Sequence, residues 1–168
     1  MKNIFSKKQL IFKLIFSLSL LGFLIVFYKA WENWLNLGTF TLAYFLGIFL
    51  LFLDEQFLYK YYVEKIDSTI QSSSHYLTLA TRNFLFILCL PFLSIFVLTS
   101  SGSVFGTAFI LAINFYLLIE MWQLRNEFLL FADRFLAMSK IKVTSNLVHK
   151  ICWLALVYFV FLLITLFF

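Results

Sequence analysis

Long runs without a charged side chain constrain this sequence more than any other feature. The run from Asn83 to Ile119 has none, and as one helix it would be about 55 Å long, well beyond the roughly 30 Å of a bilayer's hydrocarbon core. The stretch 99–103 inside it (TSSGS) is rich in turn-forming residues, which predicts two helices joined by a tight turn. Hydrophobic residues make up 63% of the chain and charged residues only 12%, about half the charged fraction of a soluble domain. The sequence therefore predicts a polytopic membrane protein and excludes an ordinary soluble domain, a disordered chain and a disulfide scaffold.

Five uncharged or nearly uncharged segments are long enough to span a bilayer, which takes about 20 apolar residues. The first of them contains Lys13, whose ammonium group we expect to snorkel towards the membrane surface. A cleaved signal peptide is the alternative for this segment, but no small-residue cleavage pattern follows it. We expect an all-α transmembrane helical bundle, a single integral membrane domain over residues 1–168, with spans at approximately 9–28, 35–53, 83–99, 104–122 and 151–168.

Basic residues are divided unequally between the two sides of the predicted bundle. With five spans, the N-terminus and the loops 54–82 and 123–150 share one side, which holds every one of the 13 Lys and Arg residues except Lys29. The positive-inside rule then places the N-terminus in the cytoplasm and the C-terminus outside, as in the plasma (inner) membrane of a prokaryote. The lipid bilayer accounts for the net charge of +5, and without a nucleic-acid-binding motif we expect no nucleic-acid partner.

Two of the predicted spans are followed by amphipathic segments. Residues 56–70 separate polar from apolar side chains on two helical faces, and residues 124–138 carry an apolar stripe at helical spacing. We expect both helices to extend into the cytoplasm, the second without interruption from about Val104 to about Ser139. Such helices would lie on the lipid surface or dock onto a partner.

Small residues at four-residue spacing mark candidate helix-packing faces, because they let two backbones approach closely. These faces serve either packing within the chain, which we favour, or assembly with a second copy or another membrane subunit. The residues concerned are Thr39, Ala43, Gly47, Gly102, Gly106, Ala108 and Ala112.

Polar residues inside the spans are the candidates for a functional site. Glu120 lies about 24 Å along the fourth span, near the inner surface, where we expect water to reach it. Asn114 is closer to the middle, at a depth similar to Ser94, and a hydrogen bond between these two would satisfy both. Pro91 removes one helical hydrogen bond in the third span and is a candidate hinge. Asn114, Tyr116 and Glu120 would line the polar path of a channel or carrier.

No motif for catalysis or for binding a metal or cofactor is present. His149 and Cys152 form one weak pair, and the adjacent Asp54 and Glu55 would point about 100° apart on a helix. Cys89 and Cys152 differ in depth, so we expect no disulfide. The sequence favours a non-catalytic integral membrane subunit without catalytic, metal or cofactor residues, which assembles with other membrane proteins or with itself. A small oligomeric channel or transporter is the alternative, and an enzyme acting on lipid is a remoter one.

Overall fold

The protein is all-helical in the computed structural model, which describes residues 7–27, 33–54, 80–100, 102–136 and 143–167. Over these residues it forms six α-helices and one turn of 3-10 helix, and no strand. They are α1 (Lys7–Phe27), α2 (Trp34–Leu53), η3 (Ala80–Arg82), α4 (Phe84–Ser100), α5 (Val104–Leu124), α6 (Phe128–Phe135) and α7 (Ser145–Phe167). The predicted all-α helical bundle is confirmed. The amphipathic segment expected at 56–70 lies outside the described residues.

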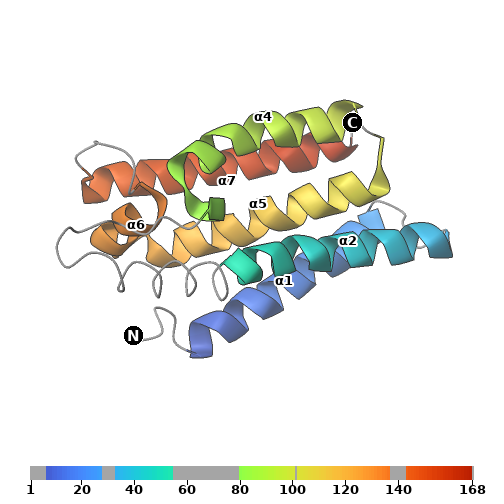
Figure 1. Cartoon of the computed structure of the whole chain (residues 1–168), viewed down its shortest axis with the longest axis horizontal. Helices are drawn as coiled ribbons and strands as arrows, with labels where there is room; N and C mark the ends of the chain where they lie inside the picture. Colours follow the sequence, from blue (N-terminus) through green and yellow to red (C-terminus); the bar gives the residue numbers. More distant parts are fainter. Residues whose placement is uncertain (1–6, 28–32, 55–79, 101, 137–142, 168) are drawn as a thin grey trace, which may run out of the picture.

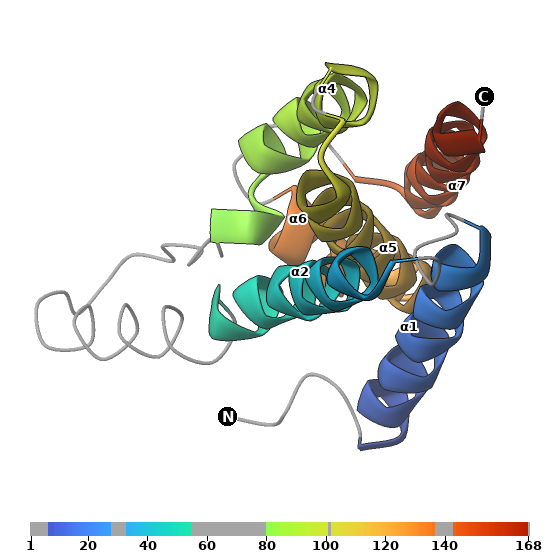
Figure 2. The same cartoon turned by 90° about the vertical axis from the view of Figure 1, so that its right-hand side faces the viewer.

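Helix α5 occupies the centre of the bundle. The view along the long axis shows α1, α2, α4 and α7 arranged around it (Figure 2). Nearly every residue of α5 from Thr107 to Met121 is buried, and α2 packs along it more extensively than any other helix does. Helix α1 begins on the side of the long axis where α6 and the start of α7 lie, and α7 ends on the other side (Figure 1). Among the described residues, α5 is thus enclosed by its neighbours, and α1, α2, α4 and α7 lie around it.

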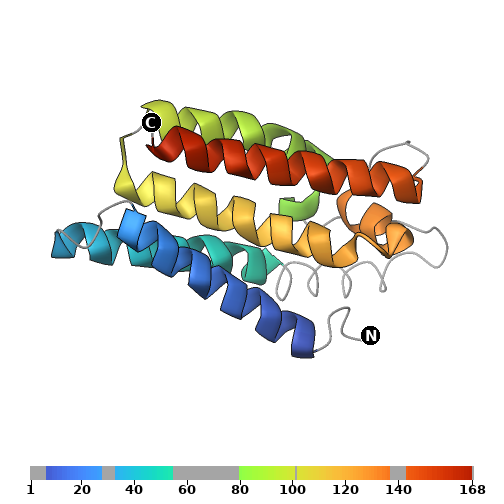
Figure 3. The same cartoon turned by 180° about the vertical axis from the view of Figure 1, so that it is seen from behind.

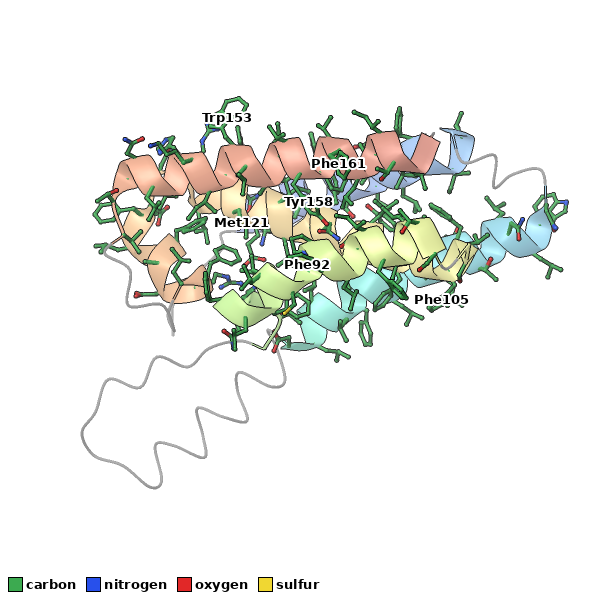
Figure 4. The ribbon with its side chains drawn as sticks, turned by 90° about the horizontal axis from the view of Figure 1, so that it is seen from above. Phe92, Phe105, Met121, Trp153, Tyr158 and Phe161 are labelled. Atoms are coloured by element: carbon green, nitrogen blue, oxygen red, sulfur yellow. The ribbon has the colours of Figure 1, made fainter. Side chains whose placement is uncertain are left out.

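Three helices are long and apolar enough to cross a membrane among those the structure describes, namely α2, α5 and the Ser145–Leu166 part of α7. The stretches Ile11–Val26 and Phe84–Ser100 are apolar but shorter. The outer helices turn large apolar side chains away from the bundle, as Phe92, Trp153 and Phe161 do (Figure 4). These features fit the predicted integral membrane protein, because in a bilayer such faces contact lipid.

Local polar contacts explain where two of the long helices begin. The Asn33 side chain accepts a hydrogen bond from the Leu35 amide (3.0 Å) at the start of α2, and the Ser103 hydroxyl accepts one from the Gly106 amide (3.2 Å) at the start of α5. Gly102, just before Ser103, has a φ of 53°, a left-handed conformation that favours glycine. The chain therefore turns between α4 and α5, and the predicted division of the long uncharged run into two helices is confirmed.

Close packing of α2 on α5 depends on small side chains. A Cβ atom on Gly47 would lie 2.8 Å from the Phe109 carbonyl oxygen and 3.0 Å from the Ala112 Cβ, too close for any larger residue. Ala43 and Ala108 are also buried in the core around this contact. These four small residues thus pack inside the chain.

The remaining small residues are placed differently. Thr39 is exposed and donates its hydroxyl hydrogen to the Leu35 carbonyl within α2. Gly102 is exposed in the turn, with no atom within 4 Å of the position a Cβ would take, and Gly106 is partly buried at the start of α5. The GxxxG spacing of these two glycines therefore spans a turn and a helix start.

The uninterrupted helix expected from about Val104 to about Ser139 is wrong. Helix α5 ends at Leu124, Glu127 leaves helical geometry (φ −109°, ψ 69°), and its amide donates to the Leu124 carbonyl (2.9 Å). The chain then folds back as α6, which buries Phe131 and Phe135 against α5 and α7 (Figure 3). The part of the apolar stripe between Phe128 and Phe135 belongs instead to a short helix packed on the bundle.

Candidate functional site

Five charged side chains are buried together at the end of the bundle where α1 begins. Each comes from a different element: α1, the residue after α2, η3, α5 and α6. We call this group the charge centre, and it consists of Lys13, Asp54, Arg82, Glu120 and Arg134.

Glu120 is the hub of the charge centre, and its side chain is fully buried. Arg82 binds it with two parallel hydrogen bonds, from Nε to Oε1 at 2.8 Å and from Nη2 to Oε2 at 2.9 Å. Arg134 donates from Nε to the same Oε1, and the Lys13 ammonium lies 3.7 Å from Oε2. The two-pronged arginine contact is the stronger, directional kind of ion pair. Three separate segments are therefore tied to one carboxylate on the central helix.

Asp54 holds the turn that presents Arg82. Its Oδ2 accepts hydrogen bonds from the Thr81 amide (2.7 Å) and from the Thr81 hydroxyl, and it lies 3.9 Å from Nη1 of Arg82. That same Nη1 donates to the Leu51 carbonyl at 3.4 Å. The Arg82 guanidinium group is fully buried. Its N–H groups donate to the Glu120 carboxylate, to the Leu51 carbonyl at the end of α2, and to the Thr81 hydroxyl in its own turn.

Because the charge centre is buried, replacing any one of its charged side chains should destabilise the fold. Taking two charges out of water costs several kcal/mol per ion, and their mutual attraction and hydrogen bonds offset that cost. Deleting one member of such a pair costs about 3–5 kcal/mol, because it leaves the other charge buried without compensation. The charge centre therefore holds the folded arrangement in place, whether or not it adds net stability over an apolar core.

Two expectations about these side chains are wrong. Lys13 does not extend to a wet surface, since it is 2% exposed and faces Glu120 and the ring of Tyr116, whose centroid is 5.1 Å from Nζ. Glu120 lies near one end of α5, as expected, but it is closed off from water. The physical reason is the same for both: the Glu120 carboxylate pairs with Lys13, Arg82 and Arg134 inside the bundle, so these side chains neutralise one another away from water.

The N-terminal half of α1 is attached to the bundle by polar contacts. Its buried stripe consists of Lys13 and Ser17 followed by Leu21 and Leu24. The Tyr44 hydroxyl donates to the Ser17 carbonyl (2.9 Å) and lies 3.1 Å from the Ser17 hydroxyl. The C-terminal half of the stripe packs in the apolar core instead. One helix thus has a polar anchor at one end and an apolar anchor at the other.

A second polar group joins α4 and α5 near the middle of the bundle. The Asn114 Nδ2 donates to the Ser94 hydroxyl at 2.8 Å, which confirms the predicted hydrogen bond, and also to the Ile110 carbonyl at 2.8 Å. Pro91 lies inside α4, and its carbonyl is 3.5 Å from the Tyr158 hydroxyl of α7. A cavity of about 230 Å³ lies between α4, α5 and α7, and its lining includes Pro91, Asn114 and Tyr158.

The candidate path residues therefore fall into separate places. Asn114 lines the small cavity, Tyr116 lies on the Lys13 side of α5, and Glu120 is enclosed by the charge centre. Over the described parts of the chain, no three His, Cys, Asp or Glu side chains meet as metal ligands.

Sequence reasoning missed Arg82 and Arg134 as site residues and gave Lys13 and Asp54 other roles. A signal for four of the five members was present. Lys13, Asp54, Arg82 and Glu120 each stand near the same predicted membrane surface, at the inner end of a different span. Opposite charges at one depth on neighbouring helices are candidates for pairing.

The chain matches no family model, none of the curated proteins and no solved structure.

Proposed function

We propose that this protein is an integral membrane protein in which α1, α2, α4, α5 and α7 each cross the bilayer, with the N-terminus in the cytoplasm and the C-terminus outside. Opposite placement of the start of α1 and the end of α7 supports an odd number of crossings (Figure 3). Helix α4 is the shortest, and its 17 residues rise about 26 Å, the lower limit for a crossing helix. The basic charge on the side of the N-terminus supports its cytoplasmic placement, and the membrane we propose is a prokaryotic inner membrane.

Within that membrane we infer a non-catalytic subunit that assembles with other membrane proteins or with a second copy. The enclosure of α5 is the observation that carries this inference. Its polar groups are used inside the chain, with Glu120 held by the charge centre and Asn114 bound to Ser94. The four outer helices present apolar faces, which are suited to packing against lipid or other spans. Such a molecule would be held together by its internal ion pairs and would offer its apolar outer faces to partner helices.

The alternative of a solute path along α5 fits this arrangement less well. A conducting path needs polar groups that face water or the solute. Asn114, Tyr116 and Glu120 are all buried against neighbouring helices. Opening a path would require the ion pairs of Glu120 to separate.

The topology can be tested by labelling single cysteines in a variant in which Cys89 and Cys152 are replaced by alanine. Ser100, at the end of α4, and Asn146, at the start of α7, are both exposed. With a membrane-impermeant maleimide on intact cells, Ser100→Cys should react, and Asn146→Cys should react only after permeabilisation. Labelling of both from the same side would overturn the five-span arrangement.

The subunit role is tested by extracting the tagged full chain in mild detergent and sizing it. We expect a complex with a membrane protein at fixed stoichiometry, or a defined homo-oligomer. A stable monomer free of other proteins would contradict this role. A liposome flux assay tests the alternative, and flux that is lost in Glu120→Gln would favour it.

A further inference from the structure

The cavity of about 230 Å³ between α4, α5 and α7 lies next to the outer surface of the bundle. Leu88 of α4 and Leu154 of α7 both line it, and these two residues are 53% and 74% exposed. Helices α4 and α7 run side by side, so the opening lies between them (Figures 1 and 3). A molecule dissolved in the bilayer would therefore enter from the side. We call this feature the α4–α7 cavity.

The walls of the α4–α7 cavity are apolar, and the described residues that line it include none with a charged side chain. Leu117 and Met121 of α5 and Ile151 and Phe159 of α7 contribute to these walls. The volume is below the range of about 300–1,000 Å³ that is typical of pockets for drug-sized ligands. The α4–α7 cavity therefore suits a small neutral molecule with an apolar body.

Asn114 adds one hydrogen-bond acceptor to this apolar setting. Its Nδ2 donates to the Ser94 hydroxyl and to the Ile110 carbonyl, each at 2.8 Å, which uses both of its hydrogens. Because a carbonyl oxygen can only accept, the contact with Ile110 identifies the nitrogen and leaves Oδ1 on the other side of the amide. Over the described parts of the chain, no donor lies within hydrogen-bond distance of Oδ1. Asn114 is 6% exposed and lines the cavity, so a donor for Oδ1 would come from that space.

Water is a poor occupant of the α4–α7 cavity. Asn114 lies about 15 Å of helical rise into α5, near the middle of the proposed crossing. A buried water typically makes about three hydrogen bonds, and cavities with apolar walls stay dry or take an apolar molecule. The other side-chain hydroxyl in the lining, that of Tyr158, contacts the Pro91 carbonyl at 3.5 Å. One O–H donor on an apolar body therefore matches this space better than several waters do.

We propose that the α4–α7 cavity binds a small neutral phenol dissolved in the membrane, whose O–H group donates to Oδ1 of Asn114. The ring would lie among the apolar side chains, where Phe159 and Met121 offer the aromatic and sulfur contacts that rings favour. The absence of charge in the lining excludes an ionic ligand, which would be buried without a counter-charge. The proposal requires a membrane protein but depends neither on its orientation nor on the subunit role.

The test compares two probes of nearly the same shape, meta-trifluoromethylphenol and its methyl ether, of which only the phenol can donate a hydrogen bond. Binding to the full chain in detergent micelles is followed by fluorine NMR, with protein-free micelles as the blank for partition into detergent. We expect saturable binding of the phenol. Its affinity should be about three- to tenfold higher than that of the ether, the range expected for one neutral hydrogen bond.

Two variants test the role of the Asn114 acceptor. Asn114→Leu removes Oδ1 and should abolish the preference for the phenol over the ether. Ser94→Ala removes a partner of the same amide but should keep the preference, because the Ile110 carbonyl still holds Nδ2. A preference that persists in Asn114→Leu would overturn the proposal.

A third variant tests the location. Ala155→Phe places a ring in the cavity and should weaken the binding of both probes. Val157→Phe is the matched control, because it introduces the same side chain on the same helix at a position that is 64% exposed and outside the lining. Equal probe binding in these two variants would contradict the proposed site.

The unaltered protein alone can also refute the proposal, even if Ala155→Phe fails to fold. Equal affinities for the phenol and the ether would do so, and so would the lack of saturable binding that is expected if the cavity holds only water. Failure of the subunit role would leave probe binding unchanged, so the two results can be told apart.

Discussion

Arg134 and Glu120 are 14 residues apart in the chain, and their side chains form an ion pair inside the bundle. On one continuous helix, residues at that separation would be about 21 Å apart. The pair can form only because the chain breaks after Leu124 and returns as α6. The ion pair therefore depends on the break between α5 and α6. Because removing one partner leaves the other charge buried, we expect substitutions in the charge centre to be strongly destabilising.

Replacing Arg82 with methionine should lower the free energy of unfolding by about 3–5 kcal/mol, because Glu120 then loses its two-pronged partner while staying buried. Unfolding in mixed detergent micelles measures this. Arg125→Met is the control, since the Arg125 guanidinium lies over the Trp122 ring (4.5 Å to the centroid) and its loss should cost about 1 kcal/mol or less. Adding Glu120→Gln to Arg82→Met should cost much less than the sum of the two single changes. A fully additive double variant would show that the pair is not coupled.

Alanine substitutions at two glycines should change stability in opposite directions. Gly47→Ala places a Cβ against the Phe109 carbonyl and should destabilise the protein by about 1–3 kcal/mol, the usual cost of overpacking. Gly22→Ala meets nothing within 4 Å and should be neutral or stabilising by up to about 1 kcal/mol, because alanine favours helix. Both are measured by the same unfolding assay. A neutral Gly47→Ala would contradict the close approach of α2 and α5.

The hydrogen bond between Asn114 and Ser94 should contribute little to stability. Interhelical hydrogen bonds in membranes contribute about 0.6 kcal/mol on average, since alternative partners exist in the unfolded state. A double-mutant cycle with Asn114→Leu and Ser94→Ala should give a coupling energy of that size. A coupling of zero would mean that the two side chains do not interact in the bilayer.

Tyr44→Phe should loosen the N-terminal half of α1 while leaving its C-terminal half in place. The hydroxyl it removes contacts Ser17, whereas Leu21 and Leu24 still pack in the apolar core. Hydrogen exchange measured by mass spectrometry should increase in the first half of α1, with little change in α5. Tyr158→Phe, which loses a contact of 3.5 Å to the Pro91 carbonyl, should leave exchange in α1 unchanged. Equal protection of α1 in the two variants would rule out the polar anchor.

Helix positions were readable from the sequence because uncharged runs and turn residues act locally. The Ser94–Asn114 contact was also predictable, since equal depth on adjacent spans leaves each residue few other partners. The charge centre was not, because a charged residue at the edge of an apolar run fits an interfacial position just as well. Which edges converge depends on the rotation and packing of whole helices.

The sequence also could not predict that α6 folds back onto the bundle. An apolar stripe has the same period on a helix that protrudes as on one that folds back. The difference depends on a few residues around Glu127 and on the affinity of Arg134 for a carboxylate one helix earlier.

The order of the charged residues along the chain has a consequence for biosynthesis. Glu120 leaves the ribosome after Lys13 and Arg82 but before Arg134. Until translation has passed α6, the acidic group can be neutralised only by the two cations made earlier. The end of the bundle that holds the charge centre is therefore completed late, when the nascent polypeptide has turned back on itself.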